Sequence, residues 1–426
     1  MAEFYCINIK IGILLLSLLC TCSCSISQDI INRQYVRSLL EQPEVLQRDP
    51  DIDYNITDII RQKGYPCEEH KVTTEDGYIL GVFRIPYGKN GSATQRLGRP
   101  VLLQHGLLDS ATTWVMNFPA QSLGFILADQ GYDVWLGNMR GNYYSRHHVK
   151  WNPDRDEEFW DFSYDEMAKF DLPNMIQYIL SKTNYTQLAY VGHSQGTMIA
   201  FAEFGRNMDL NKNVSFYAAL APVAEVGHIK SPIRHLADLS KDIEKYWHLL
   251  FGRNEFLPSS AIVKWLAVFA CTKVVVDRLM CENILFILCG PDSHYMNHTR
   301  VPVYIAHEPD GTSVKNMIHF AQGVQDKQFQ AYDYGSPDKN ELHYNQTTPP
   351  VYTITNMKIP TALFWSGEDW LADPEDVSYI FANIQSLVYE KYIPDYNHLD
   401  FVWAINANDY IYKDLINIMK EFHPPN

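Results

Sequence analysis

Positive charge is scarce in this sequence, and so are cysteines and long apolar runs. The 50 Asp and Glu residues outnumber the 35 Lys and Arg residues, which gives a net charge of −15 at pH 7. Because the sequence also has no Lys/Arg-rich run, we expect no nucleic-acid partner. It contains neither a His-Glu-x-x-His motif nor a phosphate-binding glycine loop, so we expect no metal and no cofactor. With 426 residues, 46% of them hydrophobic, the chain is long enough to bury a large core.

An apolar run near the N-terminus, residues 11–19, is too short for a membrane span, which needs about 20 apolar residues. It follows Lys10 and precedes a stretch of alternating cysteines and small polar residues. This order is typical of a secretory signal peptide, which we predict over residues 1–27 with cleavage between 22 and 27. The mature protein is then extracytoplasmic, with no stable membrane span.

Four of the eight cysteines lie within that leader, and the four that remain are Cys67, Cys271, Cys281 and Cys289. In an oxidising compartment Cys271 and Cys281 are near enough in sequence to close a small loop, whereas Cys67 is remote. If all four pair, three connectivities are possible, and the residues alone leave the choice open.

Six Asn-x-Ser/Thr sequons fit the same compartment, since each lies in a polar stretch where a surface loop is expected. We expect at least half of them to carry glycan. They are Asn55, Asn90, Asn184, Asn213, Asn297 and Asn345.

Residues 188–200 are the stretch around which the rest of the chain is organised. A short apolar run, Leu-Ala-Tyr-Val, leads into Gly-His-Ser-Gln-Gly, and a helical pattern of apolar residues follows. This order predicts a strand, a sharp turn and a helix, the arrangement known as a nucleophile elbow. Gly192 and Gly196 leave room for the strained turn, which lifts Ser194 to the edge of a sheet. Ser194 is therefore the expected nucleophile.

Strands and helices alternate around this turn. Two strand-like runs flank Thr-Thr-Glu-Asp-Gly and predict a hairpin, and strand and helix patterns then follow one another. Such alternation predicts an α/β fold with a mainly parallel sheet covered on both faces. The expected strands are residues 67–72, 78–84, 101–104, 132–136, 188–191 and 216–220, and the expected helices are 122–129 and 164–182, the second with Pro173 in its path.

The segment His-Gly-Leu-Leu at 105–108 directly follows the strand expected at 101–104. In lipases and esterases a turn of this kind supplies one backbone N–H to the oxyanion, and the residue after the nucleophile supplies another. The expected donors are the N–H groups of Leu107 and Gln195, because fixed dipoles stabilise the charge that develops on oxygen in a dry site. For the His105 side chain we favour a structural role in the turn.

The base follows from chain order, since hydrolases with this elbow place the serine first, then the acid, then the histidine. Only His398 and His423 lie downstream of a suitable acid. His423 belongs to a Pro-rich tail at the end of the chain, so His398 is the expected base.

Several carboxylates follow the apolar strand expected at 361–365 and compete for the role of the acid. Asp373 precedes Pro374 and a helical run, which is typical of a helix N-cap with proline at the first helical position. Asp369 lies nearer the strand end and is the expected acid, with Glu368 as its remaining competitor.

Six short motifs, in the same order, resemble the animal acid lipases, the family of the gastric and lysosomal acid lipases. The likeness extends from about residue 54 to 422. The motifs are Glu-Asp-Gly-Tyr-Ile-Leu from 75, Gln-His-Gly-Leu-Leu from 104, Gly-Tyr-Asp-Val-Trp-Leu-Gly-Asn from 131, Asp-Glu-Met-Ala-Lys-Phe-Asp-Leu-Pro from 165, Gly-His-Ser-Gln-Gly from 192 and Asn-His-Leu-Asp-Phe from 397.

The resemblance implies an α/β-hydrolase fold in which Ser194, Asp369 and His398 form the triad, with Leu107 and Gln195 as the oxyanion hole. These are the same residues that chain order and spacing indicate.

The resemblance also implies a disulfide between Cys271 and Cys281, with Cys289 free. Two features depart from the family pattern. Residues 28–53 form an N-terminal extension to which we assign no function, and Cys67 has no partner that the pattern supplies.

Between residues 224 and 352 the strand–helix alternation lapses, which predicts a helical cap inserted into the hydrolase core. Residues 261–271 and 284–288 are apolar on nearly every side, although the second run fits buried cap core equally well. The resemblance implies a lid at about 258–289. The expected domains are a first part of the core at 54–223, the cap at 224–352 and a second part of the core at 353–426.

Together these features predict a secreted or lysosomal serine esterase that hydrolyses neutral lipids, either triacylglycerols or steryl esters or both, at a lipid–water interface. Its expected partners are the lipid substrate and the lipid surface. One alternative is a small-ester esterase or peptidase of the same fold. The other is a non-catalytic lipid carrier with a hydrolase fold, which would be expected to have lost a member of the triad.

Overall fold

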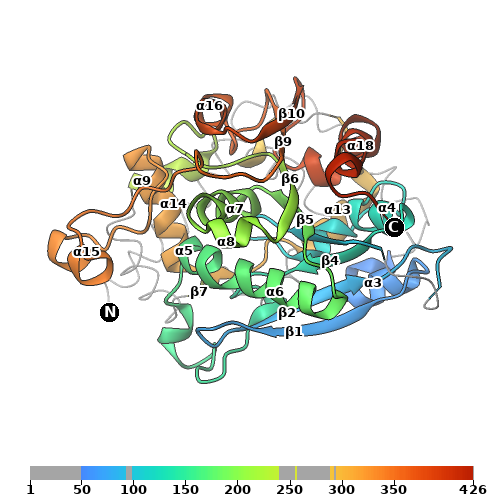
Figure 1. Cartoon of the computed structure of the whole chain (residues 1–426), viewed down its shortest axis with the longest axis horizontal. Coiled ribbons are helices and arrows are strands. Elements are labelled where there is room, and N and C mark those ends of the chain that lie inside the picture. The colour runs from blue at the N-terminus through green and yellow to red at the C-terminus, as the bar shows by residue number, and fades with distance from the viewer. Residues whose placement is uncertain (1–48, 93–97, 239–254, 257–287, 292–293, 426) are drawn as a thin grey trace, which may run out of the picture. The chain divides into compact units, whose positions relative to one another are not determined.

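An eight-stranded sheet forms the centre of the structure (Figure 1). The structure is a computed structural model that describes residues 49–92, 98–238, 255–256, 288–291 and 294–425. Only the β1–β2 and β2–β4 pairs are antiparallel, and the neighbouring strands from β4 to β10 are parallel, as the alternation of elements predicts. In order across the sheet, the strands are β1 (Glu68–Thr73), β2 (Ile79–Ile85), β4 (Asp133–Gly137), β3 (Pro100–Gln104), β5 (Leu188–His193), β6 (Val214–Leu220), β9 (Thr361–Ser366) and β10 (Leu387–Ile393).

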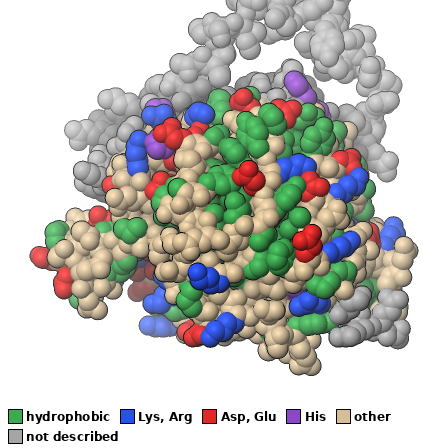
Figure 2. All heavy atoms as spheres, turned by 45° about the horizontal axis from the view of Figure 1, so that its top comes forward, with side chains coloured by type: hydrophobic (Ala, Val, Ile, Leu, Met, Phe, Trp, Pro, Cys, Tyr) green, Lys and Arg blue, Asp and Glu red, His purple; other side chains and the backbone are tan. Residues whose placement is uncertain are grey.

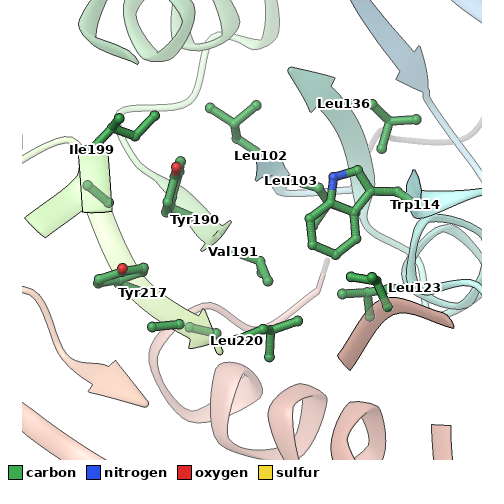
Figure 3. Packing of buried hydrophobic residues seen from close by; sticks show 14 of the residues in the cluster. Leu102, Leu103, Trp114, Leu123, Leu136, Tyr190, Val191, Ile199, Tyr217 and Leu220 are labelled. Atoms are coloured by element: carbon green, nitrogen blue, oxygen red, sulfur yellow. The ribbon is translucent and has the colours of Figure 1, made fainter. Parts of the chain in front are cut away.

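The hydrophobic core occupies both faces of this sheet. Every residue of β3, β4 and β5 is buried. Since successive side chains of a strand point to opposite faces, both faces are covered. Figure 3 shows part of this core, with side chains from β3, β4, β5 and β6 beside others from the helices. The helices that pack against the strands include α4 (Leu123–Asp129), α6 (Leu172–Thr183), α7 (Gln195–Arg206), α8 (Met208–Asn211), α16 (Pro374–Asn383) and α18 (Lys413–Phe422).

The helix expected at 164–182 is divided into three parts. It begins as α5 (Tyr164–Glu166), passes through the π-helical turn η6 (Met167–Asp171) and continues as α6. The wide turn directly precedes Pro173, whose ring nitrogen has no hydrogen to donate within a regular helix. Asp171, at the end of the wide turn, is buried and accepts hydrogen bonds from the guanidinium of Arg140. The proline therefore coincides with a change of pitch rather than with the end of the helix.

Residues 221–360 connect β6 to its parallel neighbour β9, where the sequence predicts an inserted cap. Short helices and two short strands make up its described part. The expected lid at 258–289 lies outside the described residues apart from Leu288 and Cys289, as do Cys271, Cys281 and the expected signal peptide. The described elements are α9 (His235–Asp238), β7 (Glu255–Phe256), η8 (His298–Arg300), α13 (Val301–His307), β8 (Thr312–Ser313), α14 (Val314–Asp326) and α15 (Pro337–Tyr344).

The predicted extension covers residues 28–53. Its last residues, 50–53, pack against the elements that follow them in the chain. They form the short helix η2 (Pro50–Ile52), in which Asp51 is only 2% exposed. Its carboxylate accepts hydrogen bonds from Arg300, at 2.7 Å, and from Lys63, at 2.5 Å. A buried ion pair therefore binds this segment to η8, and a second one binds it to the end of α3 (Ile56–Gln62).

The surface carries acidic and basic side chains side by side with hydrophobic groups between them, on the face shown in Figure 2. Among the described residues, no helix combines the length and the apolar character that crossing a membrane requires.

The six sequons differ in exposure. Asn55, Asn90, Asn184 and Asn345 are exposed, and Asn213 is half-buried. Asn297 departs from the surface position expected for it, because its side chain is buried, caps η8 and donates to Gln121 Oε1 at 3.4 Å. A glycan is attached to the amide nitrogen, so on Asn297 it would compete with the contact to Gln121.

The Asp51 ion pair predicts a specific loss of stability. Asp51→Ala leaves the buried Arg300 guanidinium without this carboxylate, so we expect the free energy of unfolding to fall by about 3 kcal/mol. Asp53→Ala is the matched control, since Asp53 is exposed, and it should change stability by less than about 0.5 kcal/mol. Urea unfolding of both variants measures the difference. Equal effects would contradict the docking of residues 50–53.

Candidate active site

The expected site residues follow the carboxyl ends of parallel strands. The loop at 105–108 follows β3, Ser194 follows β5, Asp369 follows β9 and His398 follows β10. Since these strands run in the same direction, the loops after them lie along one edge of the sheet. Sheet topology thus brings together residues that are far apart in the sequence.

Ser194 occupies the sharp turn between β5 and α7, as the elbow motif predicts. Its backbone has φ 53° and ψ −120°, a strained conformation for a residue with a side chain. A Cβ on Gly192 would lie 2.8 Å from the carbonyl carbon of Gly196, and a Cβ on Gly196 would lie 2.5 Å from the Gln104 carbonyl oxygen. Both glycines are therefore required by close backbone packing.

The loop after β3 lies directly against this serine. A Cβ on Gly106 would be 3.0 Å from the Cβ of Ser194, so only glycine allows so close an approach. Leu107 follows, and Gln195 is the first residue of α7, where helical N–H groups have no partner within the helix. No hydrogen bond between described residues uses either N–H group. Both expected oxyanion donors are thus available to a ligand oxygen.

His105 has the structural role expected for it. Its buried ring joins two backbone groups, with Nδ1 2.8 Å from the Gly106 carbonyl and Nε2 accepting from the Met139 N–H at 3.1 Å. A carbonyl can only accept, so Nδ1 carries the hydrogen and the ring is neutral. Burial lowers the pKa of His105 to about 4, which is consistent with this neutral form.

His398 and Asp369 form a buried hydrogen-bonded pair. Nδ1 of His398 lies 3.0 and 2.9 Å from the two carboxylate oxygens of Asp369, and the residues are 3% and 0% exposed. The N–H groups of Leu371 and Ala372 also donate to Asp369, at 2.9 and 2.7 Å. The carboxylate is therefore held in one orientation and leaves Nε2 of the imidazole for a second partner.

The two competing carboxylates occupy other positions. Asp373 is the N-cap of α16, where it accepts from the Glu375 N–H at 2.9 Å, with proline at the next position. Glu368 is exposed. Of the three carboxylates, only Asp369 is bonded to His398 in the described structure.

His193 has a role that sequence reasoning does not assign. Its Nε2 lies 2.9 Å from the backbone carbonyl of His398, and the two rings are 4.9 Å apart. Because the carbonyl only accepts, Nε2 carries the hydrogen. Burial lowers the pKa of His193 to about 3, so the ring is neutral. His193, which directly precedes Ser194, thus joins the histidine loop to the turn that carries the serine.

Residues 289–291 are the second feature that the sequence does not reveal. The Cys289 carbonyl accepts from the N–H of His398, at 3.1 Å, and from the N–H of Trp370, at 3.3 Å. The side-chain amide of Asn397 donates to the Pro291 carbonyl at 3.1 Å. This short segment therefore connects the loop that carries Asp369 with the loop that carries His398.

The cysteines of the described residues, Cys67 and Cys289, are both buried and free. A connectivity that pairs all four mature cysteines is therefore wrong, and Cys289 is free as the resemblance implies. Burial raises the pKa of the Cys67 thiol to about 11, so it stays protonated near neutral pH.

The arrangement has the parts required for acyl transfer through a serine nucleophile: a hydroxyl on a strained turn, an oriented imidazole and two backbone donors. Within the described residues, no group of three or more His, Cys, Asp or Glu side chains is placed to bind a metal ion.

Two family models match the chain. A partial alpha/beta-hydrolase lipase region matches residues 56–118, and the alpha/beta hydrolase fold matches residues 99–405. Human gastric triacylglycerol lipase is 48% identical over 372 residues, which cover 87% of this chain and 92% of that protein. Human lysosomal acid lipase/cholesteryl ester hydrolase is 47% identical over 374 residues, covering 88% and 92%.

Among solved structures, a soluble variant of monoglyceride lipase from Saccharomyces cerevisiae, in complex with a substrate analog, has a TM-score of 0.50 and 15% sequence identity. The likeness covers 84% of this chain and 96% of that chain. At this identity it shows a common fold.

The segment at 289–291 predicts the effect of substituting its glycine. Gly290 has φ +124°, and an added Cβ would lie 2.1 Å from the Glu368 carbonyl oxygen. We expect Gly290→Ala to lower the free energy of unfolding by about 3 kcal/mol. Gly335→Ala separates backbone strain from this clash, because Gly335 has φ +82° with no atom within 4 Å of the new Cβ. Gly335→Ala should lower the free energy of unfolding, measured in urea, by about 1 kcal/mol. Equal losses in the two variants would count against a tight contact between residues 289–291 and Glu368.

Proposed function

The chain belongs to the α/β-hydrolase family and, within it, to the animal acid lipases, and from this premise we propose that it hydrolyses carboxylic esters of neutral lipids through Ser194, His398 and Asp369. The observation that carries the proposal is the buried His398–Asp369 pair, which is joined through His193 to the strained Ser194 turn. A lipid carrier would have no need of this strain, or of two backbone N–H groups that take part in no hydrogen bond between described residues.

In the first half of the reaction, the Ser194 hydroxyl attacks the carbonyl carbon of the ester. His398 accepts the hydroxyl proton at Nε2, while its Nδ1–H donates to Asp369, which fixes the tautomer and stabilises the imidazolium that forms. The negative charge that develops on the carbonyl oxygen is bound by the N–H groups of Leu107 and Gln195. Collapse of the tetrahedral intermediate expels the alcohol, which takes the proton from His398, and leaves the acyl group on Ser194.

In the second half, a water molecule attacks the acyl group and His398 accepts its proton. The same two N–H groups bind the second oxyanion. Release of the fatty acid returns the proton to the Ser194 oxygen.

The proposed substrates are triacylglycerols, steryl esters or both, taken from a lipid–water surface by a secreted or lysosomal enzyme. The two relatives are named for triacylglycerol and for cholesteryl ester hydrolysis, and the chain is nearly as similar to one as to the other. Parallel assays on emulsions of the two esters distinguish these substrates. Greater activity on a soluble short-chain ester or on a peptide than on either emulsion would favour the small-ester esterase or the peptidase instead.

Removal of the nucleophile tests the proposal directly. Ser194→Ala should lower the rate of ester hydrolysis by roughly 10⁶-fold while the protein stays folded, because only binding and the oxyanion donors remain. The rate on an emulsified triacylglycerol, with circular dichroism as the check of folding, measures this. Turnover by this variant like that of the wild type would refute the serine mechanism, and no turnover by the wild type itself would favour the carrier.

Substitution of the two neighbouring carboxylates tests which one is the acid. Asp369→Asn should lower kcat by about 10⁴-fold, because an amide cannot hold the imidazole in the required tautomer. Asp373→Asn is the matched control and should mainly lower stability, by about 1 kcal/mol or less, since asparagine is also a good N-cap. Steady-state kinetics and urea unfolding are measured for both. If Asp373→Asn lowered the rate more than Asp369→Asn, Asp373 would be the catalytic acid and Asp369 the helix cap.

A further inference from the structure

The two proposed oxyanion donors, Leu107 and Gln195, are each approached by the segment between β6 and β9. The Asp310 N–H donates to the Leu108 carbonyl at 2.8 Å, in the loop after β3. The second contact comes from α14 and reaches the donor residue itself, since Asn316 Nδ2 donates to Gln195 Oε1 at 3.1 Å. Asn316 and Gln195 are 121 positions apart in the chain, so the pair exists only in the folded protein.

The side-chain amide of Gln195 is held at both of its polar atoms. Gln195 is only 3% exposed, and its Nε2 donates to the Met167 sulfur at 2.9 Å, in the π-helical turn η6. A thioether sulfur can only accept, which places Nε2 on the Met167 side and leaves Oε1 for Asn316. The Gln195 side chain therefore joins η6 to α14 in a single orientation.

Asn316 is itself fixed within the first turn of α14. Its N–H donates to Oγ of the N-cap residue Ser313 at 2.9 Å, and its Nδ2 also donates to Thr312 Oγ1 at 3.1 Å. The Ser313 hydroxyl in turn donates to the Phe162 carbonyl. Both hydrogens of the Asn316 amide are thus bonded, and one of them is directed at Gln195.

The remaining polar atom of Asn316 is unsatisfied. No described residue makes a hydrogen bond to its Oδ1, although the side chain is fully buried. An unpaired buried carbonyl oxygen lowers stability, and an apolar side chain of similar size would avoid that loss. Stability is therefore a poor reason for an asparagine at this position, and the bond to a residue that carries an oxyanion donor is a better one.

The direction of the Gln195 N–H depends on how the turn before α7 is held. This N–H belongs to the peptide group between Ser194 and Gln195, so it rotates when ψ of Ser194 and φ of Gln195 change. Ser194 is strained, at φ 53° and ψ −120°, and relaxation of the strain would rotate the peptide group. A Gln195 side chain that is bonded at both ends opposes this rotation.

We propose that Asn316 is a positioning residue for the oxyanion hole, which holds the Gln195 side chain and thereby keeps the Gln195 N–H directed at the oxygen that becomes negatively charged. The inference rests on the proposed function, because it assigns Asn316 to the same reaction. Displacement of a catalytic group by about 1 Å can lower the rate by about 100-fold. Since oxyanion donors act mainly in the transition state, loss of the Asn316 contact should lower kcat more than it changes KM.

Asn316→Leu removes the donor and keeps approximately the size of the side chain. On a soluble short-chain ester, which needs no lipid surface, kcat should fall by about 10- to 100-fold, with a much smaller change in KM. The matched control is Asn340→Leu, because Asn340 is also a buried asparagine between β6 and β9 but bonds Asp333 and Tyr334 instead. Asn340→Leu should lower Tm and leave kcat unchanged.

A double-mutant cycle separates positioning through Gln195 from any other effect of the substitution. Gln195→Met keeps the backbone N–H and removes the amide that Asn316 bonds, so it should also lower kcat. In the Gln195→Met background, Asn316→Leu should have little further effect, since the interaction that it removes is already lost. Equal losses of kcat in the two backgrounds would overturn the proposal, because Asn316 would then affect the rate without Gln195.

A kcat for Asn316→Leu equal to that of the wild type would also overturn the proposal. If Asn316→Leu does not fold, Gln195→Met decides the question, since a lower kcat supports the positioning role and a wild-type kcat rules it out. These outcomes are distinct from failure of the proposed function, which would appear as turnover by Ser194→Ala.

Discussion

The site depends on the close packing of the β5–α7 turn against the end of β3. Ser194 is held at positive φ, and the turn fits only because two glycines allow backbone atoms to approach within distances that a side chain would forbid. The same packing places Gly106 against the serine and so directs the loop that carries Leu107. One backbone contact thus positions the nucleophile and its oxyanion donors. The strained backbone of Ser194 costs free energy, which the packing of the buried sheet on either side offsets.

The segment between β6 and β9, where the sequence predicts a cap, contributes to both halves of the site. Its residues 289–291 join the acid loop to the histidine loop, and its residues 308–310 hold the loop after β3. These contacts are mainly backbone carbonyls and N–H groups, which have fixed directions and resist small displacements. This segment therefore helps to fix the loops that carry Asp369 and His398 and the loop after β3.

Buried charge is satisfied in different ways in different parts of the structure. Arg140 joins Asp76 and Asp171 beneath the π-helical turn, and Arg300 holds Asp51. Each of these carboxylates lies against an opposite charge, the usual arrangement for charged groups that are buried. Asp109 instead accepts hydrogen bonds from the backbone N–H groups of Ser110, at 2.7 Å, and Gly106, at 3.3 Å.

The sequence by itself determined the features that reside in local pattern and chain order. Alternating strands and helices predicted the mainly parallel sheet, the Gly-x-Ser-x-Gly turn predicted the elbow, and the order of serine, acid and histidine selected Asp369 and His398. Asp373 was recognisable as a cap because its signal, an aspartate before proline, lies within three residues. Only the tertiary structure decided that Asp51 is buried, that residues 289–291 connect the two catalytic loops and that the Ser110 hydroxyl donates to Glu308. Each of these depends on a contact between segments distant in the chain, and no period or motif in a single sequence specifies which buried partner a carboxylate or a carbonyl will meet.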